Sequence, residues 1–429
     1  MKALRIRCGW LLALSVLSAA ASTEQTTAIV HARLFTMETA KPIEDATIVV
    51  RDGVIKDVGA SLAPPAGARL VDAAGRIVTP GLMNAGTQLG LLEVASLADT
   101  VDHTLTNGPL GAAFDVQYAL NANSTLLVLA LGDGLTRAIT YPDASAIAPI
   151  MGQAALLRLA PATDMLDRPK VAMFVKTGGI AAQSVGGSRS AAWILLRNAL
   201  EEARRYRPTK DVSGPRDQLL SRLDAEALQP VIAGRMPLAI VAERESDIRQ
   251  AIRLYDELRL PLILYGGAEA WRVAGDLAVR GIPVVLDPTL NLPAYFDTMG
   301  ARLDNAAILH RAGVRIAFSI AGFNRSYNAG SGARLGAGLA VANGLPWIEG
   351  MRALTIVPAA IFGLDDHYGS VRHGMEADLV IWDGDPLEPS SAALQVWVRG
   401  VPISLESRLS ELARRYSPLK PHELPPAYQ

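Results

Sequence analysis

Short apolar runs separated by turn residues fill the first part of the chain and predict strands. Residues 47–55 hold two β-branched runs joined at Asp52-Gly53. This dipeptide favours a tight hairpin, because both of its residues tolerate the positive φ that the turn requires. Residues 69–78 repeat the pattern with a glycine turn. We therefore expect a small β-structure between residues 28 and 78.

From residue 81 to residue 363, apolar runs of strand length alternate with stretches of helical spacing. Residues 247–258 and 271–279 each place their apolar side chains on one face of a predicted helix. The predicted strands are 136–142, 171–176, 238–242, 262–265, 283–286 and 314–318. Alternation of this kind predicts an α/β fold, namely a (β/α)8 barrel with parallel strands.

The C-terminal part returns to strand and then to helix. Residues 396–400 predict a last strand. Residues 405–416 place Leu405, Leu409 and Leu412 on one side, which predicts an amphipathic helix. The prolines from Pro418 onward predict an extended end.

Composition limits the classes of partner. The chain has 429 residues, half of them apolar, which is enough for a large barrel and a smaller lobe. Lys plus Arg (41) and Asp plus Glu (42) nearly cancel. This balance gives no electrostatic reason to expect nucleic acid or an anionic membrane surface as a partner.

The first 21 residues have the pattern of a secretory signal peptide. Three basic residues precede an apolar run over 9–16, and Ala19-Ala20-Ala21 offers a cleavage site before Ser22. About 12 apolar residues are too few for the roughly 20 of a spanning helix, so we expect no membrane segment after cleavage. The lone Cys8 lies within this peptide, so we expect the mature chain to have neither disulfide nor thiol chemistry. We expect a periplasmic or secreted protein.

Two segments carry a resemblance to a known family. Residues 77–90 read I-V-T-P-G-L-M-N-A-G-T-Q-L-G, and residues 368–387 read Y-G-S-V-R-H-G-M-E-A-D-L-V-I-W-D-G-D-P-L. They resemble the V-x-P-G-L-I-D-A-H-T-H-L-G and G-S-I-x-x-G-x-x-A-D-L-V-V-W-D-G-D-P-L signatures of the amidohydrolase superfamily, in its imidazolonepropionase/prolidase-like branch. Weaker matches lie at 148–153 and 344–359.

The resemblance implies a TIM-like (β/α)8 barrel plus a small β-sandwich built from both chain ends. The implied division of the chain is a signal peptide over 1–21, the N-terminal half of the sandwich over 22–80, the barrel over 81–365, the C-terminal half of the sandwich over 366–403, and a helix with a Pro-rich tail over 404–429.

The family's metal ligands are replaced in this chain. In the superfamily, a metal lowers the pKa of its bound water from about 16 towards 7, which supplies hydroxide at neutral pH. The resemblance places the ligand positions, normally His or Asp, at Gly86, Gln88, Val241, Gly266 and Ala321. None of these side chains can take the place of an imidazole or carboxylate ligand. We therefore expect no metal and no other cofactor.

Neither the histidines nor the lysine of the barrel supplies a substitute. Of six histidines, only His103 and His310 lie in the barrel segment. His310 is predicted on an outer helix and His103 in a loop at the mouth, whereas a zinc site needs about three protein ligands. Lys176 is similar in position to a lysine that is carboxylated and bridges two metals in some family members. We expect an ordinary ammonium there, because metals stabilise such a carbamate.

Other chemistries have little support. A Ser-His-Asp arrangement converges only in space and stays open, but the chain lacks a G-x-S-x-G turn. The glycine-rich residues 186–189 and 328–332 do not match a phosphate loop, and we interpret them as mobile loops at the barrel mouth.

Three functional hypotheses follow. The leading one is an exported pseudoenzyme, a non-catalytic or ligand-binding subunit that accompanies an active homologue or forms a homo-oligomer. Its pocket, lined by Gln88, Tyr141, Lys176 and Asn324, would bind a small polar or peptide-like ligand. The alternative is an active hydrolase of non-peptide C–N bonds, in cyclic amides or dipeptide-like substrates, with a rearranged site and zinc or another divalent metal. The third is a solitary periplasmic binding protein.

Overall fold

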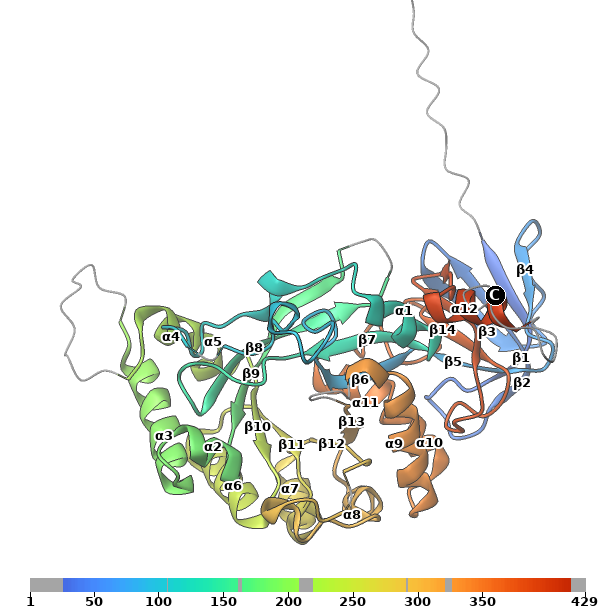
Figure 1. Cartoon of the computed structure of the whole chain (residues 1–429). Coiled ribbons are helices and arrows are strands. Elements are labelled where there is room, and N and C mark those ends of the chain that lie inside the picture. The colour runs from blue at the N-terminus through green and yellow to red at the C-terminus, as the bar shows by residue number, and fades with distance from the viewer. Residues whose placement is uncertain are drawn as a thin grey trace, which may run out of the picture.

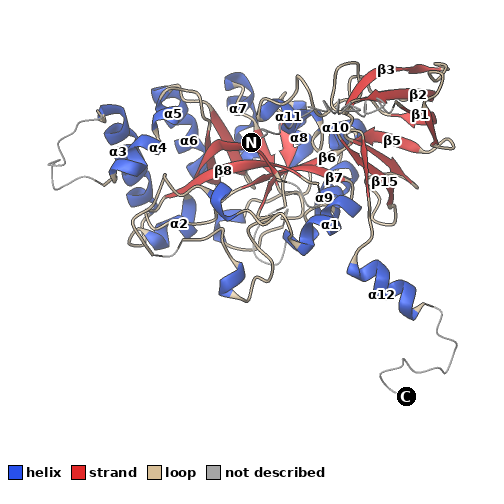
Figure 2. Ribbon diagram, turned by 90° about the horizontal axis from the view of Figure 1, so that it is seen from above, coloured by secondary structure: helices blue, strands red, loops and turns tan. Residues whose placement is uncertain are grey.

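Two sheets of eight strands each organise the protein (Figures 1 and 2). The structure, a computed structural model, describes residues 26–105, 107–160, 164–207, 219–290, 292–320 and 326–417. The predicted signal peptide, Ala321, Asn324 and the Pro-rich tail from Pro418 lie outside these residues. In the part that is described, no helix has the length and apolar character needed to span a bilayer.

The smaller sheet takes strands from both ends of the chain, as expected, and lies beside the barrel in Figure 1. Its strand order is β16-β15-β14-β5-β1-β2-β3, with β4 paired to β1. The bounds are β1 (Thr27–Leu34), β2 (Ile43–Arg51), β3 (Val54–Ala60), β4 (Arg69–Asp72), β5 (Ile77–Pro80), β14 (Leu379–Trp382), β15 (Ala393–Val398) and β16 (Val401–Ile403). The predicted hairpin joins β2 to β3, and Asp52 and Gly53 both have positive φ. Buried aliphatic side chains from both ends, including Ile48 and Leu379, form its core.

The larger sheet forms the barrel predicted between residues 81 and 363. Its order is β13-β12-β11-β10-β9-β8-β7-β6. The bounds are β6 (Leu82–Thr87), β7 (Leu135–Thr140), β8 (Ile150–Arg158), β9 (Leu166–Lys176), β10 (Leu238–Ala242), β11 (Leu262–Gly266), β12 (Val284–Leu286) and β13 (Ile316–Phe318). The TIM-like fold class is confirmed.

One strand of the barrel departs from the all-parallel expectation. Strand β8, which was not predicted, runs antiparallel to both β7 and β9. All but the last of its nine residues are buried. Gly152 and Gln153 interrupt its apolar residues, so the segment has the pattern of neither an alternating strand nor a continuous apolar run, and it escaped prediction. Among the described residues, no helix lies between β7 and β8 or between β8 and β9. These three strands are therefore joined as successive hairpins and not through helices.

A side chain closes the barrel between its first and last strands. Within the described residues, β6 and β13 share no strand ladder. The Asn84 amide spans the gap: its Nδ2 donates to the carbonyl oxygens of Ile320 (3.3 Å) and Ala329 (3.0 Å). Its Oδ1 accepts from the backbone N–H groups of Ile320 (3.2 Å) and Gly86 (2.9 Å). This buried asparagine therefore replaces part of the missing ladder.

Helices cover the outside of the barrel (Figure 1). Their bounds are α1 (Thr125–Gly132), α2 (Gly178–Ser184), α3 (Arg189–Arg205), α4 (Arg222–Ala227), α5 (Gln229–Ile232), α6 (Glu245–Leu258), α7 (Ala274–Arg280), α8 (Asn305–Arg311), α9 (Ser331–Ala342), α10 (Trp347–Arg352), α11 (Ile356–Ile361) and α12 (Arg408–Tyr416). Helix α6 buries Ile248, Ala251 and Ile252, as its spacing predicts. Helix α12 projects from the body in Figure 2 and buries no residue.

The predicted C-terminal helix begins later than expected. Ser407 is its N-cap, and its side chain accepts from the backbone N–H of Ser410 while the Ser410 hydroxyl accepts from the N–H of Ser407. This reciprocal capping starts the helix at residue 408, so Leu405 lies outside it.

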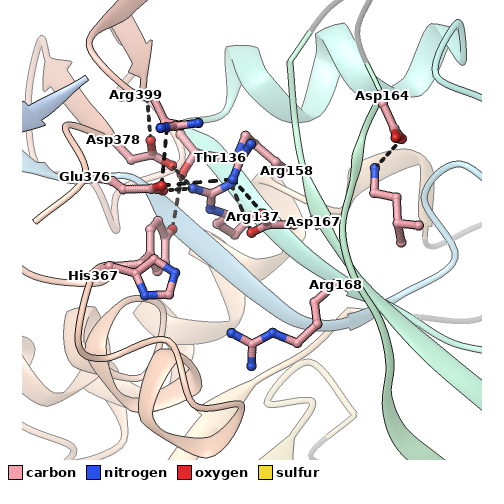
Figure 3. A network of polar contacts seen from close by, with 12 residues as sticks. Thr136, Arg137, Arg158, Asp164, Asp167, Arg168, His367, Glu376, Asp378 and Arg399 are labelled. Atoms are coloured by element: carbon pink, nitrogen blue, oxygen red, sulfur yellow. Dashed lines mark hydrogen bonds and ion pairs between the residues drawn. The ribbon is translucent and has the colours of Figure 1, made fainter. Parts of the chain in front are cut away.

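A buried arginine near the start of β7 joins the two sheets (Figure 3). Arg137 of β7 is fully buried and forms ion pairs with Glu376, with Asp378 (3.4 Å) and with Asp167 of β9 (3.4 Å). Arg158 of β8 pairs with Asp167 at 2.5 Å, which adds a second cation to the network. Residues 376–378 lead directly into β14. Three barrel strands are thereby tied to the smaller sheet.

We expect Arg137→Met to lower the free energy of unfolding by about 3–5 kcal/mol, because it leaves carboxylates buried without their cation. Urea unfolding of the purified protein measures this loss. The matched control is Arg205→Met on α3, where the exposed Arg205 pairs with Glu201 at 2.8 Å. Its cost should stay below about 1 kcal/mol. Equal small losses in both variants would show that the network contributes nothing to stability.

Candidate functional site

Polar side chains gather where the barrel strands end. Parallel strands bring their carboxyl ends to one edge, and in barrels of this class the site lies there. Glu243 follows β10, Asp287 follows β12, and Lys176 ends β9. Gln88 follows β6 and Tyr141 follows β7. This end of the barrel is called the mouth below.

An aromatic cluster fills the space beside Gly86. The rings of Tyr141 and Phe174 stack at 4.2 Å, and Tyr265 packs edge-on to Phe174 at 4.8 Å. The Tyr265 hydroxyl donates to the carbonyl oxygen of Ala85 at 2.6 Å. A Cβ added at Gly86 would lie 3.0 Å from the Tyr265 ring and 3.1 Å from the Tyr141 ring. A side chain at this position therefore requires both rings to shift by a few tenths of an ångström.

Gln88 is a buried, hydrogen-bonded side chain beneath the mouth. Only 1% of Gln88 is exposed, and its Oε1 accepts from the Ser326 hydroxyl at 3.0 Å. The Tyr141 hydroxyl also shares a hydrogen bond with the Gln88 side chain. Burial raises the pKa of Tyr141, so its hydroxyl keeps its proton at neutral pH. The two predicted pocket residues are therefore neighbours, held together by hydrogen bonds.

Lys176 lies in an ion pair at the rim. Its Nζ donates to Asp143 Oδ1 at 2.7 Å and to the Asp143 carbonyl oxygen at 3.2 Å. The Asp143 backbone N–H donates to the carbonyl oxygen of His103, which brings the 101–108 loop to the mouth. Burial lowers the pKa of His103, although Asp143 opposes the shift, so the imidazole is neutral at neutral pH. An ammonium, a carboxylate and a neutral imidazole thus form one side of the mouth.

At the end of the neighbouring strand β10, Glu243 occupies the place of the expected ligand at Gly266. The Glu243 Oε2 accepts from the backbone N–H of Ala268 at 2.9 Å. Gly266 has φ of +84°, and a Cβ added there would lie 2.3 Å from Glu243 Oε1. Val241 is part of β10, where it pairs with Lys176 and Tyr265. Glu243 therefore depends on the absence of a side chain at Gly266.

The surroundings of Glu243 favour its protonated form. Burial is the main cause that raises its pKa from 4.5 to about 7, and the negative charges of Asp287 and Asp297 raise it further, against the Ala268 hydrogen bond. Glu243 and Asp287 both line a small cavity of about 30 Å³. Sequence reasoning missed Glu243 because the family pattern directs attention to Val241. The available signal was an acidic residue directly after a predicted strand.

The described residues at the mouth do not fit a catalytic zinc ion. Aromatic rings fill the space at Gly86, and a carboxylate fills the space at Gly266. Among the described residues, no group of three or more His, Cys, Asp or Glu side chains is placed to hold a metal. A catalytic zinc site needs three protein ligands. Ala321 and Asn324, two predicted site positions, lie outside the described residues.

Comparisons with known proteins find partial sequence matches. The model of the Amidohydrolase family matches residues 282–410. The chain is 39% identical over 57 residues to amidohydrolase tasK from Hapsidospora irregularis, which is 13% of this chain and 6% of that protein. It is 62% identical over 37 residues to a dihydroorotase from Geobacter sulfurreducens, which is 9% of each chain.

The solved structure of an amidohydrolase from Thermotoga maritima MSB8 has the same fold. Its TM-score is 0.79 at 23% identity, over 88% of this chain and 99% of that one. The sequence matches span less than a tenth of each curated relative, so they establish no activity for the whole chain.

We expect Glu243→Gln to change how stability depends on pH. Between about pH 4.5 and 7, folded Glu243 holds a proton that the unfolded chain releases, so wild-type stability falls as pH rises through this window. The variant does not titrate there. Its stability relative to wild type should rise from pH 5 to 8, by on the order of 2–3 kcal/mol. Urea unfolding at pH 5, 6, 7 and 8 tests this, with the surface change Glu201→Gln as control; parallel profiles would contradict it.

We expect Gly266→Ala to destabilise the protein more than Gly281→Ala, by about 1 kcal/mol or more. Both glycines have positive φ, but an added Cβ meets Glu243 only at Gly266, whereas it meets no atom within 4 Å at Gly281. The excess cost reflects displacement of the Glu243 carboxylate from its bond to Ala268. It should vanish in a Glu243→Ala background, and a thermal unfolding cycle of the four proteins measures it. An excess that persists there would sink this assignment.

Proposed function

This chain is a member of the amidohydrolase superfamily, and on that premise we propose that it is a metal-free binding subunit rather than a hydrolase. The observation that carries this proposal is the filling of the vacated ligand positions. Tyr141 and Tyr265 occupy the space beside Gly86, and Glu243 occupies the space beside Gly266. Fold alone does not establish an activity, so the site decides.

Filled positions differ from merely empty ones. If Gly86 and Gly266 faced open space, one substitution each could rebuild a ligand. Here an added side chain at Gly266 must displace a hydrogen-bonded carboxylate, and one at Gly86 must displace two packed rings. The mouth is thus stabilised around side chains that exclude the metal chemistry of the superfamily.

The mouth keeps groups that suit a small polar or peptide-like ligand. Lys176 and Asp143 form an ion pair whose side chains are 22% and 44% exposed, so both charges are accessible. Glu243 and Asp287 line the adjacent cavity. Charged and hydrogen-bonding groups converging at the mouth of a barrel are typical of a ligand site.

An exposed apolar surface supports a protein partner, which we propose to be an active homologue of this chain or a second copy of it. Leu292, Phe296 and Met299, in the segment between β12 and α8, are 64%, 70% and 62% exposed. Clusters of large exposed apolar side chains on one segment commonly mark protein interfaces. The signal-peptide pattern of residues 1–21 adds that this assembly acts outside the cytoplasm.

One observation favours the alternative, an active hydrolase of non-peptide C–N bonds. A carboxyl group with a pKa of about 7, such as Glu243, suits a general base at neutral pH. In that case Glu243 would itself activate a water, because the metal ligands of the family are replaced.

The purified mature chain, from Ser22 onward, is incubated with zinc and manganese, and loosely bound ions are then removed. We expect it to retain less than about a tenth of an equivalent of metal, because a catalytic site needs about three protein ligands. Elemental analysis by mass spectrometry measures this content. The variant Gly86→His/Gln88→His should bind no more, because the aromatic cluster fills the site. One or two tightly held equivalents would overturn the proposal, and amide hydrolysis lost in Glu243→Gln would establish the alternative.

A further inference from the structure

An open groove lies between helices α3 and α6 on the outer face of the barrel (Figure 1). Its volume of about 340 Å³ falls in the range of small-molecule sites. Arg189, Arg197 and Arg244 line it, together with the side chains of Ser190 and Ser246. The groove therefore presents guanidinium and hydroxyl groups, which are hydrogen-bond donors.

The guanidinium of Arg244 is only partly bonded. Its Nε donates to the Ser246 hydroxyl at 2.7 Å and lies 3.7 Å from Asp247 Oδ2. Among the described residues, its two terminal nitrogens make no hydrogen bond, and 29% of the side chain is exposed. The bond to Ser246 holds the guanidinium in place, so its terminal edge is available to an acceptor in the groove.

The other two arginines are paired with acids outside the lining of the groove. Arg189 forms an ion pair with Asp297, and Arg197 forms one with Glu257. Asp297 also accepts from the backbone N–H of Gly179, which holds it away from Arg244. These pairs leave Arg244 as the cation of the groove that can bind a ligand.

Asp247 lines the groove but does not satisfy Arg244. Only 3% of Asp247 is exposed, and its Oδ2 lies 3.7 Å from the Nε atoms of both Arg189 and Arg244. This oxygen makes no hydrogen bond within the described part of the chain. One buried carboxylate is thus shared by two guanidiniums at more than hydrogen-bond distance. Since the three arginines already have three carboxylates near them, a ligand with one negative charge suits the groove better than a dianion.

The N-terminus of helix α3 adds backbone donors to the same place. The helix has 17 residues, and its first turn contains no acidic residue. Its N-cap, Ser188, forms no side-chain cap bond among the described residues. The first N–H groups of a helix have no partner within it and carry the positive end of its dipole. Arg189 and Ser190 begin the helix and line the groove, so these donors lie at its edge.

One wall of the groove is apolar. Ile194 follows Ser190 by four residues on α3, so both lie on the same face of the helix. Ile194 is 62% exposed, and Trp193 beside it is buried. An exposed isoleucine next to a partly bonded arginine offers contact to the apolar part of a bound molecule.

We propose that this groove binds a small ligand that has one carboxylate and an apolar body. The carboxylate accepts from the two terminal nitrogens of Arg244 and from the Ser190 and Ser246 hydroxyls. The planar edge of a guanidinium matches the two oxygens of a carboxylate in a bidentate pair. The apolar body lies on Ile194. This site is separate from the mouth, so it does not depend on the proposed function.

The test uses benzoate as the probe, benzamide as its neutral counterpart of equal shape, and inorganic phosphate as an oxyanion without an apolar body. Isothermal titration calorimetry on the full mature chain at neutral pH gives each dissociation constant. We expect benzoate to bind at least about tenfold more tightly than benzamide, because charge-assisted hydrogen bonds are stronger than neutral ones. Phosphate should bind more weakly than benzoate, because it has no apolar surface to bury.

We expect Arg244→Gln to weaken benzoate binding at least about tenfold, since it removes the bidentate pair. The matched control is Arg249→Gln on the same helix, because Arg249 pairs with Asp276 of α7 and faces away from α3. Ile194→Glu, at an exposed position, should weaken binding as well by placing a negative charge on the wall. Lys176→Gln at the mouth should leave the affinity unchanged.

Three results would overturn the assignment: equal affinity for benzamide, tighter binding of phosphate, or unchanged benzoate affinity in Arg244→Gln and Ile194→Glu. Loss of binding in Lys176→Gln with full affinity in Arg244→Gln would also overturn it, because the carboxylate would then lie at the mouth. Thermal unfolding shows whether each variant is folded. If Arg244→Gln is not folded, the exposed change Ile194→Glu decides the outcome.

Discussion

The buried guanidinium of Arg137 is the interaction on which the architecture depends. It lies near the start of β7, where Glu376, Asp378 and Asp167 surround it. Burial of a charge is costly unless partners surround it, so the positions of these groups are mutually dependent. Because Asp167 and the pair Glu376 and Asp378 lie more than 200 positions apart in the chain, this part of the barrel and the smaller sheet are held in one fixed arrangement.

The mouth, at the other end of the same strands, is organised by packing rather than by charge pairing alone. The ring of Tyr141, which follows β7, meets rings from β9 and β11 beside Gly86, and the carboxylate after β10 lies against Gly266. These two glycines are therefore structural partners of their neighbours and not simply sites where a ligand has been lost. The strand ends that would converge on a metal converge here on an aromatic cluster and a carboxyl-lined cavity.

Much of the fold follows from local pattern. The period of the apolar residues predicted most of the barrel strands and helix α6, and the Asp52-Gly53 turn predicted its hairpin. The closing segment predicted that both chain ends share a sheet. Strand β8 escaped because Gly152 and Gln153 interrupt its apolar residues, and the start of α12 depends on the cap at Ser407, which the spacing of leucines does not reveal. At the site, side-chain identities were readable, but the contact of Glu243 with Gly266 arises only from tertiary packing.

The Asn84 seam has a mechanical consequence. A strand ladder spreads its hydrogen bonds along several residues. The junction of β6 and β13 relies instead on the Asn84 amide and on two neighbouring carbonyl oxygens, those of Leu354 and Ala353, which accept from the N–H groups of Met83 and Phe318. Local opening of a protein begins where few buried hydrogen bonds resist it. Asn84 also accepts from the N–H of Gly86, two residues before Gln88. Local opening between β6 and β13 would therefore also release the backbone of Gly86 at the mouth.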